Sequence, residues 1–253
     1  MTQNPRKKDE FYVNYGKMPS GFLRHLLWFI PLLAAIAIAL ALLLPGIHDH
    51  FNEGRFAGRS ETEGILLAKP VPHLLVPRSG ETGTGVKYSR YILMDTDKSG
   101  VDESDLEKAG QWVSLTGITI HRDSLTVIAT QSVEAIDTPE NAPTPDRERS
   151  LGEFTLVGEI LDSKCYPGVM KRGRTAIHRS CAIRCISGGV PPIFLVENEA
   201  GEKMYFVLSD REGKAVNDRI LDKVADEVRI TGEVIQAGDM FILKADPDTY
   251  ELV

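Results

Sequence analysis

Four residues with metal-binding side chains lie close together in the second half of the chain. They are Cys165, His178, Cys181 and Cys185, and the chain contains no other cysteine. A helix is predicted over 176–187, with Thr175 as its N-cap and Gly188-Gly189 as its stop. This helix puts positions 178, 181 and 185 within an arc of about 60°, because each residue turns the helix by about 100°. Cys165 follows a strand predicted at 157–161 and can close over that helical face. Three thiolates and one imidazole complete the tetrahedral ligand set that zinc prefers.

This ligand set leaves the identity of the metal open. An iron–sulfur cluster can accept a histidine in place of a thiolate, and copper also binds thiolate and imidazole. Two interpretations need no metal: a structural disulfide between Cys165 and either Cys181 or Cys185, and thiol redox chemistry of Cys181 and Cys185. The C-x12-H-x2-C-x3-C spacing differs from the common C-x2-C zinc signatures and does not decide between them.

Basic side chains surround these ligands in the sequence. They could stabilise thiolates, offset the negative charge of a metal–thiolate centre, or bind an anionic ligand or an acidic partner. For any one of them, a place on the solvated surface is the simpler interpretation. The candidates are Lys164, Lys171, Arg172, Arg174, Arg179 and Arg184.

Two segments of the chain align with each other without a gap at an offset of 115 residues. Residues 91–95 (YILMD) match 206–210 (FVLSD), and residues 113–117 (VSLTG) match 228–232 (VRITG). Each copy predicts a strand, a polar loop with a short helix, and two strands around a turn. An upstream match, of 64–66 to 158–160, has an offset of 94 instead. The second copy therefore contains about 21 additional residues, and all three cysteines lie in that insert.

Short alternating strands with a V-x-[L/I]-T-G pattern favour a mainly β fold of two small barrels that look like the OB-fold, a five-stranded Greek-key barrel. A β-sandwich with a similar strand count is the competing architecture. We expect the first OB-like domain at 60–136 and the second, with its helical Cys/His insert, at 151–253. Residues 137–150 contain three prolines and no apolar periodicity, which predicts a linker.

A charge-free apolar segment precedes both copies. No Asp, Glu, Lys or Arg occurs between Arg24 and Asp49. The 19 residues from Leu26 to Leu44 would extend roughly 28 Å as a helix, about the thickness of a bilayer core. We expect a transmembrane signal anchor at 26–46, in contact with the lipid bilayer. A cleaved signal peptide is disfavoured, because the segment is long and lacks a small-x-small cleavage motif.

The charges on the two sides of this segment differ. Residues 1–25 carry a net charge of +3 and the remainder of the chain −10. The positive-inside rule then predicts a cytoplasmic tail at 1–25 and the bulk of the chain in the periplasm, as in a single-pass protein of a bacterial inner membrane. The overall net charge of −7 argues against nucleic-acid binding, because phosphate contacts need clustered Lys and Arg.

Residues 95–100 (DTDKSG) look like the start of an EF-hand calcium loop. The fit fails further along, because Asp102 occupies the apolar eighth position and Leu106 replaces the terminal glutamate. We interpret this segment as an acidic surface loop.

One motif supports a family resemblance. The run H-R-x-C-A-x-x-C-x-x-x-G-x-P-P begins at His178 and is preceded by D-S-x-C at 162–165. It resembles a group of exported, poorly characterised bacterial OB-like domains. The resemblance covers roughly residues 153–246, and neither the anchor nor the first copy. It implies an OB-like fold and a Cys/His site in the second copy, but it supplies no reaction.

These features point to a membrane-anchored extracytoplasmic protein with a Cys3His metal or iron–sulfur site. We expect an accessory or electron-transfer component of a membrane redox system, with a membrane protein as partner. The alternative is a non-catalytic binding or assembly module whose insert is held by a structural disulfide; tethering to the membrane would serve either role by raising the effective concentration near the partner. An enzyme that uses the cysteines directly ranks last, because His178 is the only evident acid–base partner.

Overall fold

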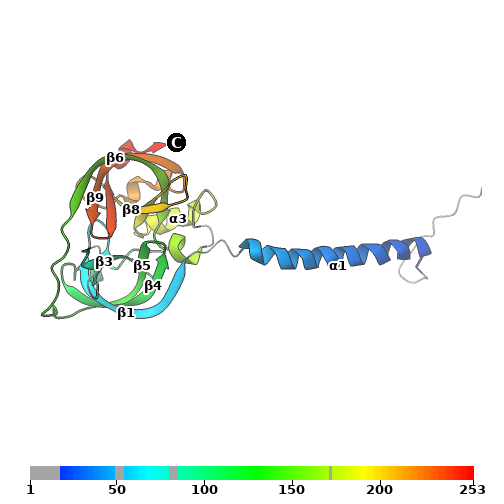
Figure 1. Cartoon of the computed structure of the whole chain (residues 1–253), viewed down its shortest axis with the longest axis horizontal. Coiled ribbons are helices and arrows are strands. Elements are labelled where there is room, and N and C mark those ends of the chain that lie inside the picture. Colours follow the sequence, from blue (N-terminus) through cyan, green and yellow to red (C-terminus); the bar gives the residue numbers. More distant parts are fainter. Residues whose placement is uncertain (1–17, 49–53, 80–84, 171–172) are drawn as a thin grey trace, which may run out of the picture. The chain divides into compact units, whose positions relative to one another are not determined.

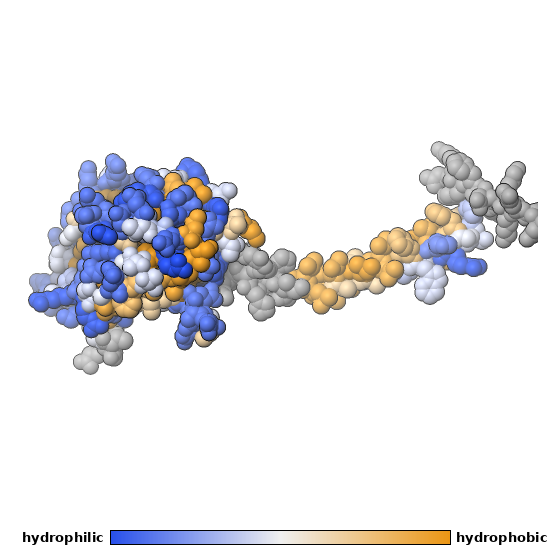
Figure 2. Space-filling model, turned by 90° about the horizontal axis from the view of Figure 1, so that it is seen from above, coloured by the Kyte–Doolittle hydropathy of each residue, from blue (hydrophilic) through white to orange (hydrophobic). Residues whose placement is uncertain are grey.

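The computed structural model describes residues 18–48, 54–79, 85–170 and 173–253, and the chain divides into two compact units, Met1–His50 and Phe51–Val253. Within the described residues of the first unit, Ser20–His48 form the helix α1. Its segment Ser20–Leu44 is long and apolar enough to cross a membrane, and its most apolar window is not buried within the protein. Figure 2 shows an almost continuous apolar surface along α1. The predicted apolar N-terminal helix is confirmed, and it begins six residues before position 26.

The first barrel belongs to the second unit (Figure 1). Five strands close it in the order β1-β2-β3-β5-β4, with β4 paired back to β1. All neighbouring strands are antiparallel except β3 and β5, which run parallel. The elements are β1 (Arg55–Leu67), β2 (His73–Pro77), β3 (Tyr88–Asp95), α2 (Glu103–Leu106), β4 (Trp112–Arg122) and β5 (Leu125–Ala135).

The second barrel has the same strand order, and one strand is added to it. β6, β7, β8, β10 and β9 close in that order, β8 and β10 run parallel, and β11 pairs with β9. The mainly β fold with two small barrels is thus confirmed, and the sandwich alternative is wrong. The strands are β6 (Arg149–Asp162), β7 (Pro192–Glu197), β8 (Lys203–Ser209), β9 (Glu227–Ala237), β10 (Met240–Lys244) and β11 (Glu251–Leu252), and the short turns η3 (Asn217–Arg219), η4 (Leu221–Lys223) and η5 (Pro247–Thr249) connect them.

Residues that match at the 115-residue offset occupy equivalent places in the two barrels. Ile92 lies opposite Val127 in the parallel pair of the first barrel, and Val207 lies opposite Ile242 in that of the second. Both pairs are related by the same offset. The gapless alignment therefore describes two barrels that share one strand register from their third strand to their fifth.

The first strand of each barrel carries a glycine where it approaches the second strand. A Cβ atom at Gly64 would lie 2.2 Å from the carbonyl oxygen of Leu75, and one at Gly158 would lie 2.3 Å from that of Leu195. No side chain fits at such a distance, so both positions require glycine. The match at an offset of 94 residues thus marks equivalent positions as well.

The two barrels differ most in the connection between their first two strands. Residues 68–72 connect β1 to β2, whereas residues 163–191 connect β6 to β7. The longer connection contains the helical turn η2 (Cys165–Val169) and the helix α3 (Arg179–Ser187). The additional residues of the second copy therefore form this connection.

One buried apolar cluster joins the two barrels. It combines Ile92 and Ile120 of the first barrel with Cys165, Cys185 and Val207 of the second. Two of the three cysteines thus lie in a core to which both barrels contribute.

The segment expected to be a linker is held against the first barrel. The hydroxyl of Tyr88 donates a hydrogen bond to the carbonyl oxygen of Pro143 at 2.5 Å, and the backbone N–H of Lys87 donates to the carboxylate of Asp146. β6 begins within this segment, at Arg149. Residues 137–148 therefore follow the surface of the barrel unit, and do not form part of either barrel wall.

Candidate functional site

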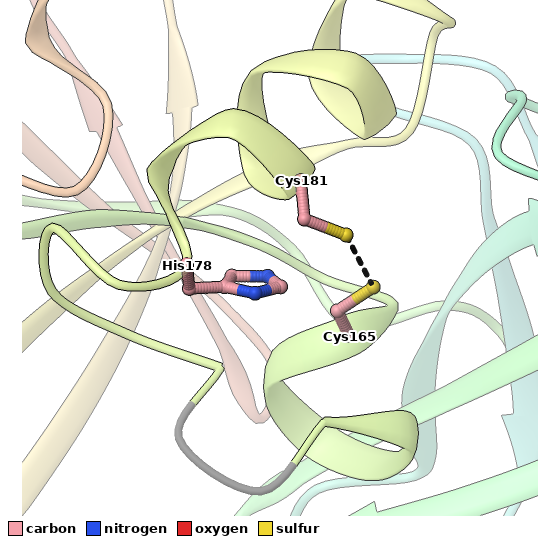
Figure 3. A group of neighbouring side chains, drawn as sticks. All are labelled: Cys165, His178 and Cys181. Carbon is pink, nitrogen blue, oxygen red and sulfur yellow. Dashed lines mark hydrogen bonds between the residues drawn. The ribbon is translucent and has the colours of Figure 1, made fainter.

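The four predicted ligands are brought together by the β6–β7 connection. Cys165 begins η2 directly after β6, His178 caps the N-terminus of α3, and Cys181 and Cys185 lie on successive turns of α3. Figure 3 shows the side chains of Cys165, His178 and Cys181 directed toward one another. Their ligand atoms all lie within 4.8 Å of each other, as a metal site requires.

The helix that carries these ligands begins later than predicted. It starts at Arg179, three residues after position 176, and Thr175 has a positive φ of 66°. The carboxylate of Glu159 in β6 accepts a hydrogen bond from the backbone N–H of Thr175 and lies 3.2 Å from the guanidinium of Arg174. The left-handed backbone of Thr175 is not the extended backbone of an N-cap. Residues 175–178 form a turn instead, in which the backbone N–H of His178 donates to the carbonyl oxygen of Thr175 at 2.9 Å, and the imidazole of His178 therefore lies at the end of the helix.

The C-terminus of α3 agrees with the prediction. Gly188 is the C-cap, and Gly189 has a φ of 97°, which favours glycine. The backbone N–H of Val190 donates to the carbonyl oxygen of Cys185 at 3.0 Å and closes the last turn.

The sulfur atoms have the spacing of a mononuclear thiolate site. The Sγ of Cys165 lies 3.8 Å from the Sγ of Cys181 and 3.8 Å from that of Cys185, and all three thiols are free. A disulfide needs about 2.05 Å. A tetrahedral ion with metal–sulfur bonds of about 2.3 Å holds its sulfurs about 3.8 Å apart. The thiols are thus separated as zinc-type coordination demands.

The imidazole of His178 has one nitrogen engaged and one nitrogen available. Its Nε2 lies 2.8 Å from Oδ2 of Asp162, and both side chains are completely buried. Its Nδ1 is also buried and has no hydrogen-bond partner among the described residues. A carboxylate on one ring nitrogen fixes the tautomer and leaves a lone pair on the other, which is the usual arrangement of a metal-bound histidine.

The carboxylate of Asp162 contacts both His178 and the backbone next to the first cysteine. Its Oδ1 accepts hydrogen bonds from the backbone N–H of Cys165 at 2.6 Å and of Lys164 at 3.2 Å. One carboxylate therefore orients both the imidazole of His178 and the backbone that carries the first thiol. Spacing and residue type did not predict Asp162 as a site residue; the signal in the sequence was its place at the start of the D-S-x-C run.

Two lysines reach this site, and one of them comes from the other barrel. The Nζ of Lys98, in the loop between β3 and α2, donates to the Sγ of Cys181 at 3.2 Å. The Nζ of Lys164 donates to the carbonyl oxygen of Asp95 in the same loop at 2.8 Å. Lys98 belongs to the segment predicted to be an acidic surface loop, and no local pattern links it to a cysteine 83 residues away.

The local charges shift the pKa values of the groups at the site. A hydrogen bond from the Cys165 thiol lowers the pKa of Cys185 and raises the pKa of Cys165 itself. The hydrogen bond to Cys181 raises the pKa of Lys98 and so keeps it cationic. Burial lowers the pKa of Lys164. The hydrogen bond from Cys165 therefore favours the thiolate of Cys185 even without an ion.

The other predicted basic residues have different surroundings. Arg179 forms an ion pair with Asp226 on the second barrel, and Arg184 is exposed on α3. Lys171 and Arg172 lie outside the described residues.

The comparisons with known proteins add no assignment. No family model, no curated protein and no solved structure matches this chain.

Proposed function

We propose that this chain is a membrane-anchored extracytoplasmic protein that holds one metal ion with Cys165, His178, Cys181 and Cys185. The observation that carries the proposal is the buried Nδ1 of His178, which has no partner among the described residues while its Nε2 is engaged by Asp162. A buried polar atom without a partner costs about 1–3 kcal/mol, and a bound ion removes that cost.

The sulfur spacing favours a single ion over an iron–sulfur cluster. In a [4Fe–4S] cluster each cysteine binds a different iron, and in a [2Fe–2S] cluster the ligands are divided two to each iron, so one cysteine cannot share its iron with two others. The Sγ of Cys165 lies 3.8 Å from both other sulfurs, as on one shared ion. Thiolate-rich sites with an imidazole suit zinc or copper. The disulfide alternative lacks support, because the chain has free thiols 3.8 Å apart.

The role that follows depends on the ion. Zinc has no redox chemistry, so a zinc centre would make the chain an accessory component of a membrane redox system. A copper ion would make it an electron carrier. In either case a membrane protein is the expected partner, because the anchor concentrates the barrel unit at the membrane.

The membrane orientation and the ancestry of the barrels belong to the same proposal. The positive charge of residues 1–25 supports a cytoplasmic N-terminus, and the bulk of the chain then lies in the bacterial periplasm. The shared strand order and the shared register support a duplicated OB-like barrel. The same order supports the resemblance of residues 153–246 to exported bacterial OB-like domains.

One experiment tests the proposal. The full chain is purified in detergent, and its metal content, visible absorption and free thiols are measured on the same sample. We expect one metal ion per chain and no disulfide. Zinc and copper(I) give a colourless protein and are distinguished by the metal analysis, whereas copper(II) or iron bound to thiolate gives visible absorption. A metal-free protein with a disulfide and one free thiol would contradict the metal site and favour the binding module.

Variants identify the ligands. We expect His178→Ala and Cys181→Ser to lower metal affinity by about 100-fold or more, since each removes a ligand. His121→Ala is the matched control, because His121 lies in β4 and its Nδ1 is bonded to Thr126 at 3.0 Å. Full metal retention by the Cys181→Ser protein would show that this ligand set is wrong.

A further inference from the structure

The first barrel takes part in the metal site. We infer that its loop of residues 95–101 is the lid of that site, and that Lys98 is a positioning residue whose ammonium group balances the charge of the metal–thiolate centre. The inference rests on the proposed function. It extends that function by giving the first barrel a role at a centre whose ligands all belong to the second.

Lys98 meets the cluster at its open side. Cys165, Cys185 and His178 are buried, whereas Cys181 is partly exposed. The Nζ of Lys98 lies 3.2 Å from the Sγ of Cys181. A charged hydrogen bond thus covers the one thiol through which solvent, a chelator or a partner would reach the ion.

The backbone of the lid is fixed at two places. Lys164, next to Cys165, donates from its Nζ to the carbonyl oxygens of Asp95, Thr96 and Asp97. At the other end of the loop, the backbone N–H of Gly100 donates to the carbonyl oxygen of Gly188 at 2.9 Å. The loop is thus attached to both segments that carry the thiols.

Glycines permit this close approach. A Cβ atom at Gly188 would lie 2.1 Å from the carbonyl oxygen of Lys98, and one at Gly100 would lie 2.6 Å from that of Gly189. Backbone atoms cannot move aside as a flexible side chain can. Any larger residue at these positions must therefore separate the lid from α3.

The loaded site has a net negative charge that nearby cationic side chains can balance. A divalent ion with three thiolates, a neutral imidazole and the carboxylate of Asp162 carries a net charge of −2. Lys98 and Lys164 together supply +2. Uncompensated charge in a protein interior is costly, so both lysines favour the loaded site.

The second barrel contains an equivalent turn that has no lysine at the position of Lys98. The backbone N–H of Asp95 donates to the carbonyl oxygen of Ser99, and 115 residues later Asp210 donates to Lys214 in the same way. The turn is therefore common to both barrels. The position of Lys98 in this turn is occupied by a glycine, Gly213, in the second barrel, so the contact to Cys181 is specific to the first.

The charge of Lys98 is tested with the full chain in detergent and zinc alone as the probe. Affinity is measured by competition with a chromophoric chelator, and release by excess chelator. We expect Lys98→Met to weaken zinc binding by about 10-fold or more and to speed release, and Lys98→Arg to lose less because it keeps the charge. Lys108→Met is the control, since Lys108 lies in the same barrel but pairs with Asp105. Equal affinities of the Lys98→Met protein, the Lys108→Met protein and the wild type would overturn the role of Lys98.

The lid itself is tested without metal. In the metal-free full chain, Gly100→Ala should speed alkylation of Cys181 by iodoacetamide several-fold, read by peptide mass spectrometry, because the added methyl group separates the loop from α3. Ser104→Ala in α2 is the control. An unchanged alkylation rate would overturn the lid. A wild type that binds neither zinc nor copper would instead overturn the proposed metal site, and with it the charge-balancing role of Lys98, while the alkylation result would still show whether the loop covers Cys181.

Discussion

Replacing Asp162 by asparagine tests whether its carboxylate fixes the tautomer of His178. The carboxylate accepts hydrogen bonds on both sides: from Nε2 of His178 at 2.8 Å and from the backbone N–H of Cys165 at 2.6 Å. Asparagine has nearly the same shape but only one accepting oxygen, and its amide nitrogen donates. One of the two sides must therefore be mismatched in the Asp162→Asn protein.

Either orientation of the new amide group disturbs one of the two hydrogen bonds. If its nitrogen faces His178, Nε2 must accept and the ring proton moves to Nδ1, which then has no lone pair for a metal. If its nitrogen faces the backbone N–H of Cys165, two donors oppose each other in a buried place. Loss of such an orienting partner lowers metal affinity by about 10–100-fold, equivalent to about 1.4–2.8 kcal/mol.

The assay is zinc competition at neutral pH on the full chain, with Asp226→Asn as the matched control. Asp226 pairs with Arg179 on α3 but does not touch His178, so we expect its variant to bind zinc as the wild type does. An Asp162→Asn protein with affinity within twofold of the wild type would refute the reasoning. An equal loss in the Asp226→Asn protein would refute it too, because the effect would then be one of general charge.

Three further outcomes are expected. Burial lowers the pKa of His73 to about 4. On acidification the unfolded chain therefore binds a proton at His73 at about pH 6.5, whereas the folded chain does not. The free energy of unfolding should fall by about 3 kcal/mol as the pH drops from 6.5 to 4. Urea unfolding at both pH values checks this, and a His73→Gln protein with an undiminished pH dependence would contradict it. Gly158→Ala should lower the free energy of unfolding by about 1–3 kcal/mol, because its Cβ would lie 2.3 Å from the carbonyl oxygen of Leu195; denaturant titration measures it, and a loss no greater than that of the exposed Ser180→Ala protein would argue against the close approach. Free zinc at 100 times its Kd should stabilise the fold by about 2.7 kcal/mol, seen as a rise in Tm by circular dichroism, and the same rise in the Cys181→Ser protein would count against the ligand set.

Local patterns in the sequence determined much of the architecture. Alternating apolar residues at 113–117 and 228–232 predicted strands that the structure contains as parts of β4 and β9. Gly188 and Gly189 predicted the end of α3, because a glycine accepts the positive φ that closes a helix. The uncharged segment before the barrels predicted α1 from composition alone. Each of these features depends on residues that are close together in the chain.

The start of α3 could not be predicted in this way. The sequence favoured Thr175 as the N-cap, but Thr175, whose backbone N–H donates to the carboxylate of Glu159, has a φ of 66° that an N-cap does not adopt, and the helix begins at Arg179. The local capping preference is thus not realised. Because the helix begins later, His178 lies at its end, next to Asp162.

Some residues of the candidate site could be predicted from the sequence, and others only from the tertiary structure. Sequence spacing determined that Cys165, His178, Cys181 and Cys185 belong together, since they lie on one connection between two consecutive strands. Only the tertiary structure decided that Asp162 holds Nε2 of His178 and leaves Nδ1 buried with no hydrogen-bond partner among the described residues. Only the packing of the two barrels brought Lys98 to Cys181 across 83 residues. Hydrogen-bond direction and charge balance are properties of atoms in contact, and contacts between distant residues exist only once the chain has folded.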